Sequence, residues 1–142
     1  MTRRRIQTAF AVAAVTVAAI LSSGCGGGDD QGNTPQQVAQ AYANARSQSD
    51  AAALCHLYTP EIQQQTEPKQ TCVEFVRKRM ALIAKQQKGL RLSVMRVDVQ
   101  GNTGAAVIAT EQNGTPSLPA TIPLARVGEG WRVAGFDLST GL

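Results

Sequence analysis

Apolar residues recur at helical spacing from residue 34 onward. The first stripe, at positions i, i+3, i+4 and i+7, consists of Val38, Ala41, Tyr42 and Ala45. Thr34, Pro35 and Gln37 supply an N-cap, a proline at the first helical position and a capping box. The pattern therefore predicts a helix that begins at Thr34, buries one face and is interrupted at the polar segment 47–49.

Three further helical segments follow before the pattern changes. Asp50 is suited to cap a second helix, and segment 59–61 to begin a short third one. The polar stretch 63–70 has little to bury and predicts an exposed loop. Segment 71–74 is a second capping box, and we expect Gly89 to end the helix that it opens. The buried stripe of that helix is predicted to be Cys72, Val76, Met80 and Ile83.

After Gly89 the apolar period falls from 3.6 residues to two, which indicates strands. The alternation changes phase between residues 94 and 95, as it does at a β-bulge, so we expect a bent strand over 90–99. Asn113-Gly114 is a strong turn signal, and Pro123 predicts an edge position or a bulge in its strand. The remaining strands are expected at 105–111, 120–127 and 131–136, joined by short turns into an antiparallel meander.

Helices precede strands along the chain, and this segregation predicts an α+β fold rather than alternating βαβ units. Across residues 34–137, the chain resembles small secreted members of the nuclear transport factor 2-like superfamily. The resemblance is carried by Thr34-Pro35, by the segments 50–55 and 59–61, and by Gly130-Trp131-Arg132-Val133. It implies N-terminal helices packed in the concave face of a curved four-stranded antiparallel sheet. Members include isomerases, dehydratases and non-enzymatic modules, and the resemblance also implies a homodimer through the outer sheet face.

The N-terminal segment has a different pattern. Arg3, Arg4 and Arg5 precede an apolar run over 9–21, and its 13 residues fall short of the about 20 that span a membrane. Small residues then lead to Cys25, an order that resembles a bacterial lipoprotein signal peptide. We expect a signal peptide over 1–24, a flexible tether over 25–33 and one domain over 34–142. With lipid on Cys25, the chain would be exported and anchored to the outer face of the bacterial cell membrane. An ordinary secretory signal, which would leave Cys25 as a free thiol, is the alternative.

The cysteine count bears on both expectations. If Cys25 carries lipid, Cys55 and Cys72 remain, 17 residues apart. In an exported chain such a pair predicts one disulfide, here between two adjacent helices. Closing a loop of that length contributes about 3 kcal/mol in the chain-entropy model. Two buried free thiols or a redox pair are the alternatives, although the C-x-x-C spacing of a redox site is absent.

Charge is more informative by position than in total. Without the predicted signal peptide the chain has eleven basic and ten acidic residues, and this balance does not indicate a nucleic-acid partner. No acid occurs between Glu74 and Asp98. That stretch is suited to face anionic lipid headgroups, with an ordinary solvated helix face as the alternative. Its basic residues are Arg77, Lys78, Arg79, Lys85, Lys88, Arg91 and Arg96.

The resemblance also implies where a ligand pocket would lie, inside the cone. The residues that we expect to line it are Tyr42, Tyr58 and Trp131, although core packing is the simpler role for Tyr42 and Trp131. By residue type alone, the acids that match the base of the family's enzymes are Asp98, Glu111 and Asp137. Strand alternation turns Asp98 toward solvent. The single histidine, His56, follows Cys55 on a helix and cannot face it, so we expect an exposed imidazole.

These observations favour a membrane-tethered extracytoplasmic binding or interaction module without catalytic activity. No residue spacing predicts a metal site, and we expect no cofactor. The alternatives are a carrier or sensor of a small apolar ligand held in the cone, suggested by the many alanines and valines, and an enzyme of the isomerase or dehydratase type. Partners would be the membrane, through Cys25, and a small apolar ligand, a protein or a second copy of the chain.

Overall fold

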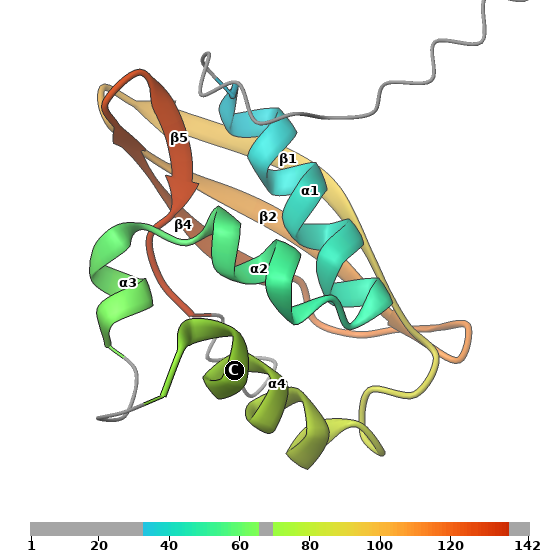
Figure 1. Cartoon of the computed structure of the whole chain (residues 1–142). Helices are drawn as coiled ribbons and strands as arrows, with labels where there is room; N and C mark the ends of the chain where they lie inside the picture. The colour runs from blue at the N-terminus through green and yellow to red at the C-terminus, as the bar shows by residue number, and fades with distance from the viewer. Residues whose placement is uncertain (1–32, 66–69, 137–142) are drawn as a thin grey trace, which may run out of the picture.

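A computed structural model describes residues 33–65 and 70–136, and the predicted signal peptide, Cys25, most of the tether and Asp137 lie outside these ranges. The described helices are α1 (Pro35–Gln48), α2 (Ala51–Leu57), α3 (Pro60–Gln64) and α4 (Cys72–Ile83). The described strands are β1 (Leu90–Gln100), β2 (Thr103–Gln112), β3 (Thr115–Pro116), β4 (Ala120–Val127) and β5 (Gly130–Val133). Helices therefore precede strands, which confirms the predicted α+β class (Figure 1). Because α3 runs to Gln64, the loop predicted from residue 63 begins later than expected.

Each helix begins where the sequence supplies a cap. Thr34 Oγ1 accepts the Gln37 N–H at 3.2 Å, and Gln37 Oε1 accepts the Thr34 N–H at 2.8 Å. Thr71 and Glu74 form the same reciprocal pair at the start of α4, at 3.3 and 2.9 Å. Both predicted capping boxes are thus confirmed, and they satisfy backbone donors that have no partner within a helix. The N-caps of α2 and α3 are Asp50 and Thr59.

The helix ends follow the sequence less closely. α1 ends within the predicted interruption at 47–49. α4 ends at Ile83, so the prediction that Gly89 ends this helix is wrong. Residues 84–89 form turns, and Gly89, with a φ of +74°, leads into β1. A Cβ at Gly89 would overlap the Asn113 side chain. A glycine is therefore needed here, where the turn before β1 lies against the turn that contains Asn113.

The strands form one antiparallel sheet in the order β1-β2-β4-β5, with β3 paired to β2. This is the predicted meander with one two-residue strand more than the four expected. The register of β1 shifts between Val94 and Arg96, so Met95 is the extra residue of the predicted bulge. β4 is an inner strand, yet β5 pairs only with Leu124–Val127. Pro123 lies just before this pairing begins, and its carbonyl accepts the Ala134 N–H. The proline therefore occupies an edge position only at this point of an otherwise inner strand.

The core fills the concave side of the curved sheet, across which α1 lies, with α2 packed against α1 (Figure 1). Small residues on the inner face of α1 allow its backbone to approach the strands closely, and Ala43 is fully buried there. The ring of Trp131 lies against Gly104 of β2, where an added Cβ would be 3.4 Å from it. The core therefore joins the first helix to the last strand. Its largest apolar members include Tyr42, Leu54, Tyr58, Ile108, Ile122 and Leu124.

α4 lies at the margin of the molecule, packed against α2 rather than across the sheet (Figure 1). A disulfide joins Cys55 of α2 to Cys72 of α4, with the Cα atoms 5.9 Å apart, as the cysteine count predicted. Three rings continue this contact: Tyr58 and Phe136 lie 5.2 Å apart, and Phe136 and Phe75 lie 6.0 Å apart. The fully buried residues of α4 are Val76 and Met80.

Candidate functional site

The three residues predicted to line a pocket all lie in the core. Tyr42 and Tyr58 are each 1% exposed, and Trp131 is 8% exposed. They come from α1, from the residue after α2 and from β5, and all three belong to one buried cluster. The backbone of Tyr58 pairs with Val133, and the next N–H, of Thr59, donates to the Val133 carbonyl at 2.9 Å. These side chains close the space between helices and sheet.

Arg46 is a buried charge that the sequence analysis did not single out. It projects from the last turn of α1, its side chain is 2% exposed, and its Nη1 donates to Gln87 Oε1 at 3.1 Å. A buried guanidinium requires hydrogen-bond partners, so Arg46 holds the turn after α4 against α1. Its spacing could have indicated this burial, since Arg46 follows Tyr42 by four residues and lies on the same buried face of α1.

The titratable candidates lie on separate elements. His56 is exposed on α2, as predicted. Asp98 is exposed on β1, also as predicted, and pairs with Arg96 at 3.0 Å. Glu111 is half-buried on β2, where it pairs with Arg91 of β1. Asp98 pairs with Ala105, which precedes Glu111 by six residues on the same strand, so the two acids are separated by about 20 Å along the sheet. The structure does not bring these groups together, and Asp137 lies outside the described residues.

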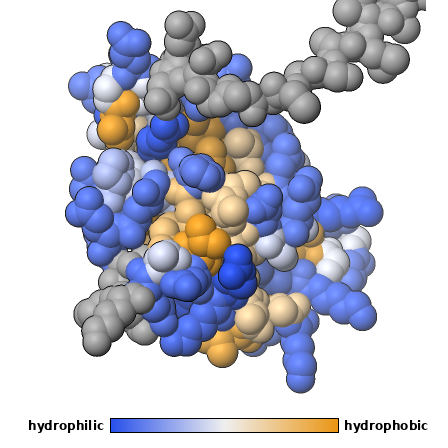
Figure 2. Space-filling model, viewed as in Figure 1, coloured by the Kyte–Doolittle hydropathy of each residue, from blue (hydrophilic) through white to orange (hydrophobic). Residues whose placement is uncertain are grey.

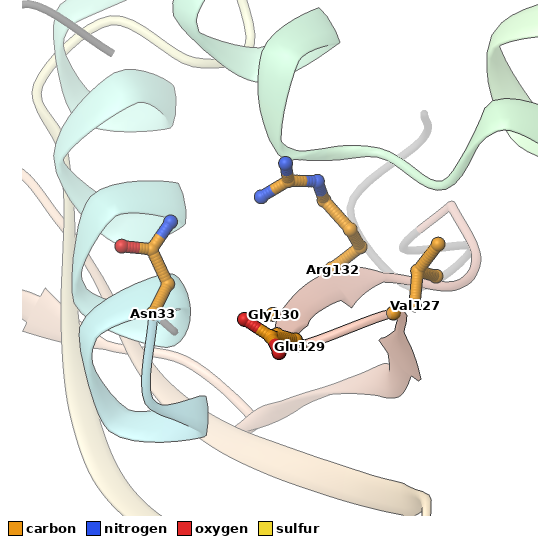
Figure 3. Close-up of a pocket in the computed structure, with 6 residues that line it drawn as sticks. Asn33, Val127, Glu129, Gly130 and Arg132 are labelled. Atoms are coloured by element: carbon orange, nitrogen blue, oxygen red, sulfur yellow. The ribbon is translucent and has the colours of Figure 1, made fainter. Parts of the chain in front are cut away.

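A hollow of about 380 Å³ lies at the end of the molecule where α1 begins. The Glu129 carboxylate lies between Asn33, beside the start of α1, and the β4–β5 turn, while the Arg132 guanidinium extends away from that turn (Figure 3). Val127 and the glycines of the turn complete the lining. One cation, one anion and one amide at an open rim can hydrogen-bond a polar group, but their charges balance and favour no particular ligand charge.

Two more hollows lie along the sheet. One, of about 390 Å³, includes Arg91, Ser93, Glu111 and Pro116 in its lining. The other, of about 210 Å³, is lined by the ends of β1 and β2 around Asp98. Between them, the face of β2 opposite the core presents small side chains. These are Ala105, Val107 and Ala109. Neither hollow includes a residue from the helices.

Among the described residues, positive charge is concentrated on α4 and the turn after it, which we call the α4 basic face. Its cations are all exposed, and among them Leu82 is 73% exposed. The guanidinium carbon of Arg79 lies 5.7 Å from the centre of the Phe75 ring, so this cation is held along the helix. The α4 basic face consists of Arg77, Lys78, Arg79, Leu82, Lys85 and Lys88. Hydrophilic side chains project along the corresponding lower edge of the space-filling view, with hydrophobic atoms between them (Figure 2).

Glu74 is the acid at the start of this helix. The backbone N–H of Thr71 donates to its carboxylate, and this bond, followed by the Thr71 side chain and the charge of Arg77, holds the pKa of Glu74 below its ordinary value. The carboxylate is thereby engaged in the cap, where negative charge is also favoured by the helix dipole. The cations further along α4 have no acid beside them in sequence until Asp98.

The described residues contain neither a metal-binding cluster nor a helix suited to span a membrane. Across 33–65 and 70–136, no three histidine, cysteine, aspartate or glutamate residues are grouped in a way that could hold a metal ion. No helix in the same ranges combines the length and apolar character needed to cross a membrane.

Comparison with known proteins places the fold. No family model matches the sequence, and no curated protein matches it either. A solved protein from Thiobacillus denitrificans ATCC 25259, named as a calcium/calmodulin-dependent protein kinase type II association domain, superposes with a TM-score of 0.50 at 12% identity, over 75% of this chain and 94% of that one. A de novo designed protein with a curved β-sheet gives 0.40 at 17% identity, over 67% and 93%. The first likeness shows that this chain has a nuclear transport factor 2-like α+β fold.

Proposed function

We propose that the protein is a membrane-tethered, extracytoplasmic interaction module that acts through its outer surface and does not catalyse a reaction. A nuclear transport factor 2-like fold hosts enzymes, carriers and interaction modules alike, so the fold does not choose among them. The choice depends on what occupies the concave side of the sheet and on what the surface offers.

The observation that carries the proposal is the packing of that concave side. Tyr42, Tyr58 and Trp131 would have to face a ligand in a carrier or an isomerase, but they are 1%, 1% and 8% exposed within a continuous apolar cluster. Several of the alanines that suggested an unfilled cone are buried in the core, and Ala106 of β2 is fully buried. Most charged side chains of the described residues are instead exposed on the surface. This distribution supports recognition at the surface rather than in an internal pocket.

The tethered part of the proposal comes from the sequence before residue 33. Arg3 to Arg5, the apolar run 9–21 and Cys25 have the order of a lipoprotein signal, in which Cys25 becomes the lipid-bearing first residue. The disulfide between Cys55 and Cys72 fits an oxidising compartment, in which such bonds persist. Eight residues, 26–33, separate Cys25 from Thr34 at the start of the domain, so an anchored domain would stay close to the bilayer.

Fractionation of cells that express the full chain tests the anchor. We expect the wild-type chain in the membrane fraction and Cys25→Ser in the soluble fraction. A variant with both Cys55→Ser and Cys72→Ser is the matched control, because it loses two cysteines and should remain with the membranes. If Cys25→Ser also stays with the membranes, the lipid-anchor proposal is wrong.

Native mass spectrometry after mild extraction tests the choice between an interaction module and a carrier. We expect the mass of the chain with its lipid on Cys25 and no further adduct. A stoichiometric apolar adduct would favour the carrier, and its loss in Tyr42→Phe or Tyr58→Phe would locate it inside the cone. Such a result would overturn the proposal even if the anchor is confirmed.

A further inference from the structure

The proposed function leaves open which surface the protein uses. The α4 basic face is the strongest candidate, because it combines concentrated charge with an exposed apolar side chain. Lys78 and Leu82, one turn apart on α4, lie opposite the buried Val76 and Met80, and Lys85 and Lys88 follow in the turns after the helix. A leucine that is 73% exposed between two lysines has no role in the packing of the described structure.

We propose that the α4 basic face docks on the anionic lipid headgroups of the same membrane that carries the anchor. This inference rests on the proposed tether. Lysine and arginine side chains attract anionic lipids, and an apolar side chain between them can enter the boundary between headgroups and acyl chains. Leu82 would be the inserted group, with Arg79, Lys85 and Lys88 around it as the headgroup contacts.

The helix is held in place before it meets any partner. Its first turn is closed by the Thr71–Glu74 capping box, and its N-terminus is joined to α2 by the Cys55–Cys72 disulfide. Docking therefore does not require the ordering of a chain segment, a cost that disordered basic segments must meet. The burial of Val76 and Met80 sets which side of α4 faces outward.

The tether makes weak docking sufficient. Each lysine or arginine near an anionic surface strengthens binding roughly five-fold, so three cations supply about a hundred-fold. Such binding is too weak for a freely diffusing domain. A short flexible link raises the effective concentration of a tethered partner to the millimolar range, at which contacts of this strength become populated. The anchor and the basic face thus have complementary roles.

The geometry predicts how the docked domain lies. Asn33, where the tether meets the domain, is at the end of α1 opposite to its contact with the turn after α4. The 14 residues of α1 separate the two by about 21 Å. Eight tether residues, 26–33, span on average about 15–17 Å and at most about 27 Å. The domain can therefore lie on its side, with Asn33 and α4 both near the bilayer.

An acidic protein is the alternative partner for a basic surface. The membrane is favoured because none of the three hollows described above is lined by a residue of α4. A convex helix face with one protruding leucine fits a planar, deformable surface better than the shaped pocket that usually receives a protein anchor residue.

The test uses a tryptophan at the proposed point of insertion. The full lipid-anchored chain with Leu82→Trp is reconstituted into vesicles of brominated phosphatidylcholine, with and without phosphatidylglycerol, and quenching of its fluorescence is measured against the wild type. The single natural tryptophan, Trp131, is 8% exposed and provides the background. The matched control is Thr121→Trp, because Thr121 is exposed on β4 between two inward-facing residues and so lies on the opposite side of the sheet from the helices.

We expect quenching of Leu82→Trp in the anionic vesicles to be at least three-fold stronger than that of Thr121→Trp. Adding Lys85→Glu and Lys88→Glu should reduce it to the level seen with phosphatidylcholine alone, since two lost cations weaken binding by about 25-fold. Salt at about 1 M should have the same effect, because it shortens the screening length to about 3 Å.

Three results would overturn the inference. The first is equal quenching of the two tryptophans in anionic vesicles, and the second is equal quenching of Leu82→Trp with and without phosphatidylglycerol. The third is protection of Leu82→Trp from an aqueous quencher by soluble poly-glutamate but not by vesicles, which would assign the face to an acidic macromolecule. Failure of the anchor is recognised separately, because it appears in the fractionation of Cys25→Ser and not in the quenching of an anchored chain.

Discussion

α1 and α4 begin with the same local chemistry and end in different environments. Each opens with a threonine N-cap and a capping box, closed by Gln37 in α1 and by Glu74 in α4, and they are 14 and 12 residues long. Yet α1 buries six residues across the sheet, including the charged Arg46, whereas α4 buries two. α4 is instead joined to the body by a disulfide and a line of aromatic rings.

This difference separates what forms a helix from what holds it in place. Caps and apolar spacing are local and act equally in both helices. α1 is held by burial on the concave face, and its exposed positions, such as Gln36, Gln40 and Asn44, carry no charge. α4 is held by a disulfide at one end and by the burial of Val76 and Met80 on one side, and this leaves its other side exposed. The surface that we propose as functional is therefore on the one of these two helices that contributes less to the core.

The largest expected effect compares two leucines. Leu54 is 0% exposed on α2 and Leu82 is 73% exposed on α4. Leu54→Ala should lower the free energy of unfolding by about 2–5 kcal/mol, because it removes buried methyl groups and leaves a cavity. Leu82→Ala should change it by less than about 0.5 kcal/mol. Urea unfolding followed by Trp131 fluorescence measures both, and a large loss in Leu82→Ala would mean that this residue packs against part of the protein.

The next effect concerns the covalent link. The double variant Cys55→Ser/Cys72→Ser should lower the free energy of unfolding by about 3 kcal/mol, because it frees a loop of 17 residues in the unfolded chain. Hydrogen exchange should also accelerate more in α4 than in α1, since α4 loses its attachment while α1 keeps its burial. Equal acceleration in both helices would show that α4 and the sheet unfold as one unit.

The smallest effects concern the caps. Thr34→Ala and Thr71→Ala should each cost about 1 kcal/mol of stability, measured by the same urea unfolding. Their pH dependence should differ, because only the α4 cap is closed by a carboxylate. The pKa of Glu74 is lowered in the folded state by the Thr71 N–H, so its stabilising effect is present above the unfolded pKa and is lost as the pH falls through the folded value.

Hydrogen exchange of α4 as a function of pH distinguishes the two caps. After correction for the intrinsic exchange rate, protection of α4 should fall at acidic pH in the wild type and much less in Glu74→Gln, which gives α4 the same box as α1. The Gln37 cap of α1 serves as the internal control. An unchanged acidic fall in Glu74→Gln would assign it to another carboxylate.

Most of the fold was predictable from the sequence because its signals are local. The two capping boxes, the bulge at Met95 and the strand over Ala120–Val127 all depend on neighbours within a few residues. Gly89 was misinterpreted for the same reason. Its position after a helix suggested an end signal, but its role depends on Asn113, which is distant in sequence and adjacent in space.

The candidate site was less predictable. The sequence identified the basic stretch between Glu74 and Asp98, but periodicity alone could not show that Leu82 would be exposed among its cations. It nominated Tyr42, Tyr58 and Trp131 for a pocket by resemblance, and their depth in the core depends on how tightly α1 approaches the sheet. Arg46 was overlooked because a charged residue in the last turn of a helix is usually solvated.

The sequence by itself determined the order and type of the elements, the pairing of Cys55 with Cys72, and the concentration of positive charge beyond Glu74. These follow from spacing, capping chemistry and cysteine count, which act along the chain. Only the tertiary structure decided that the concave side would be closed and that α4 would be the exposed helix. Burial depends on the summed volumes and approach of elements far apart in sequence, and no local pattern contains that sum.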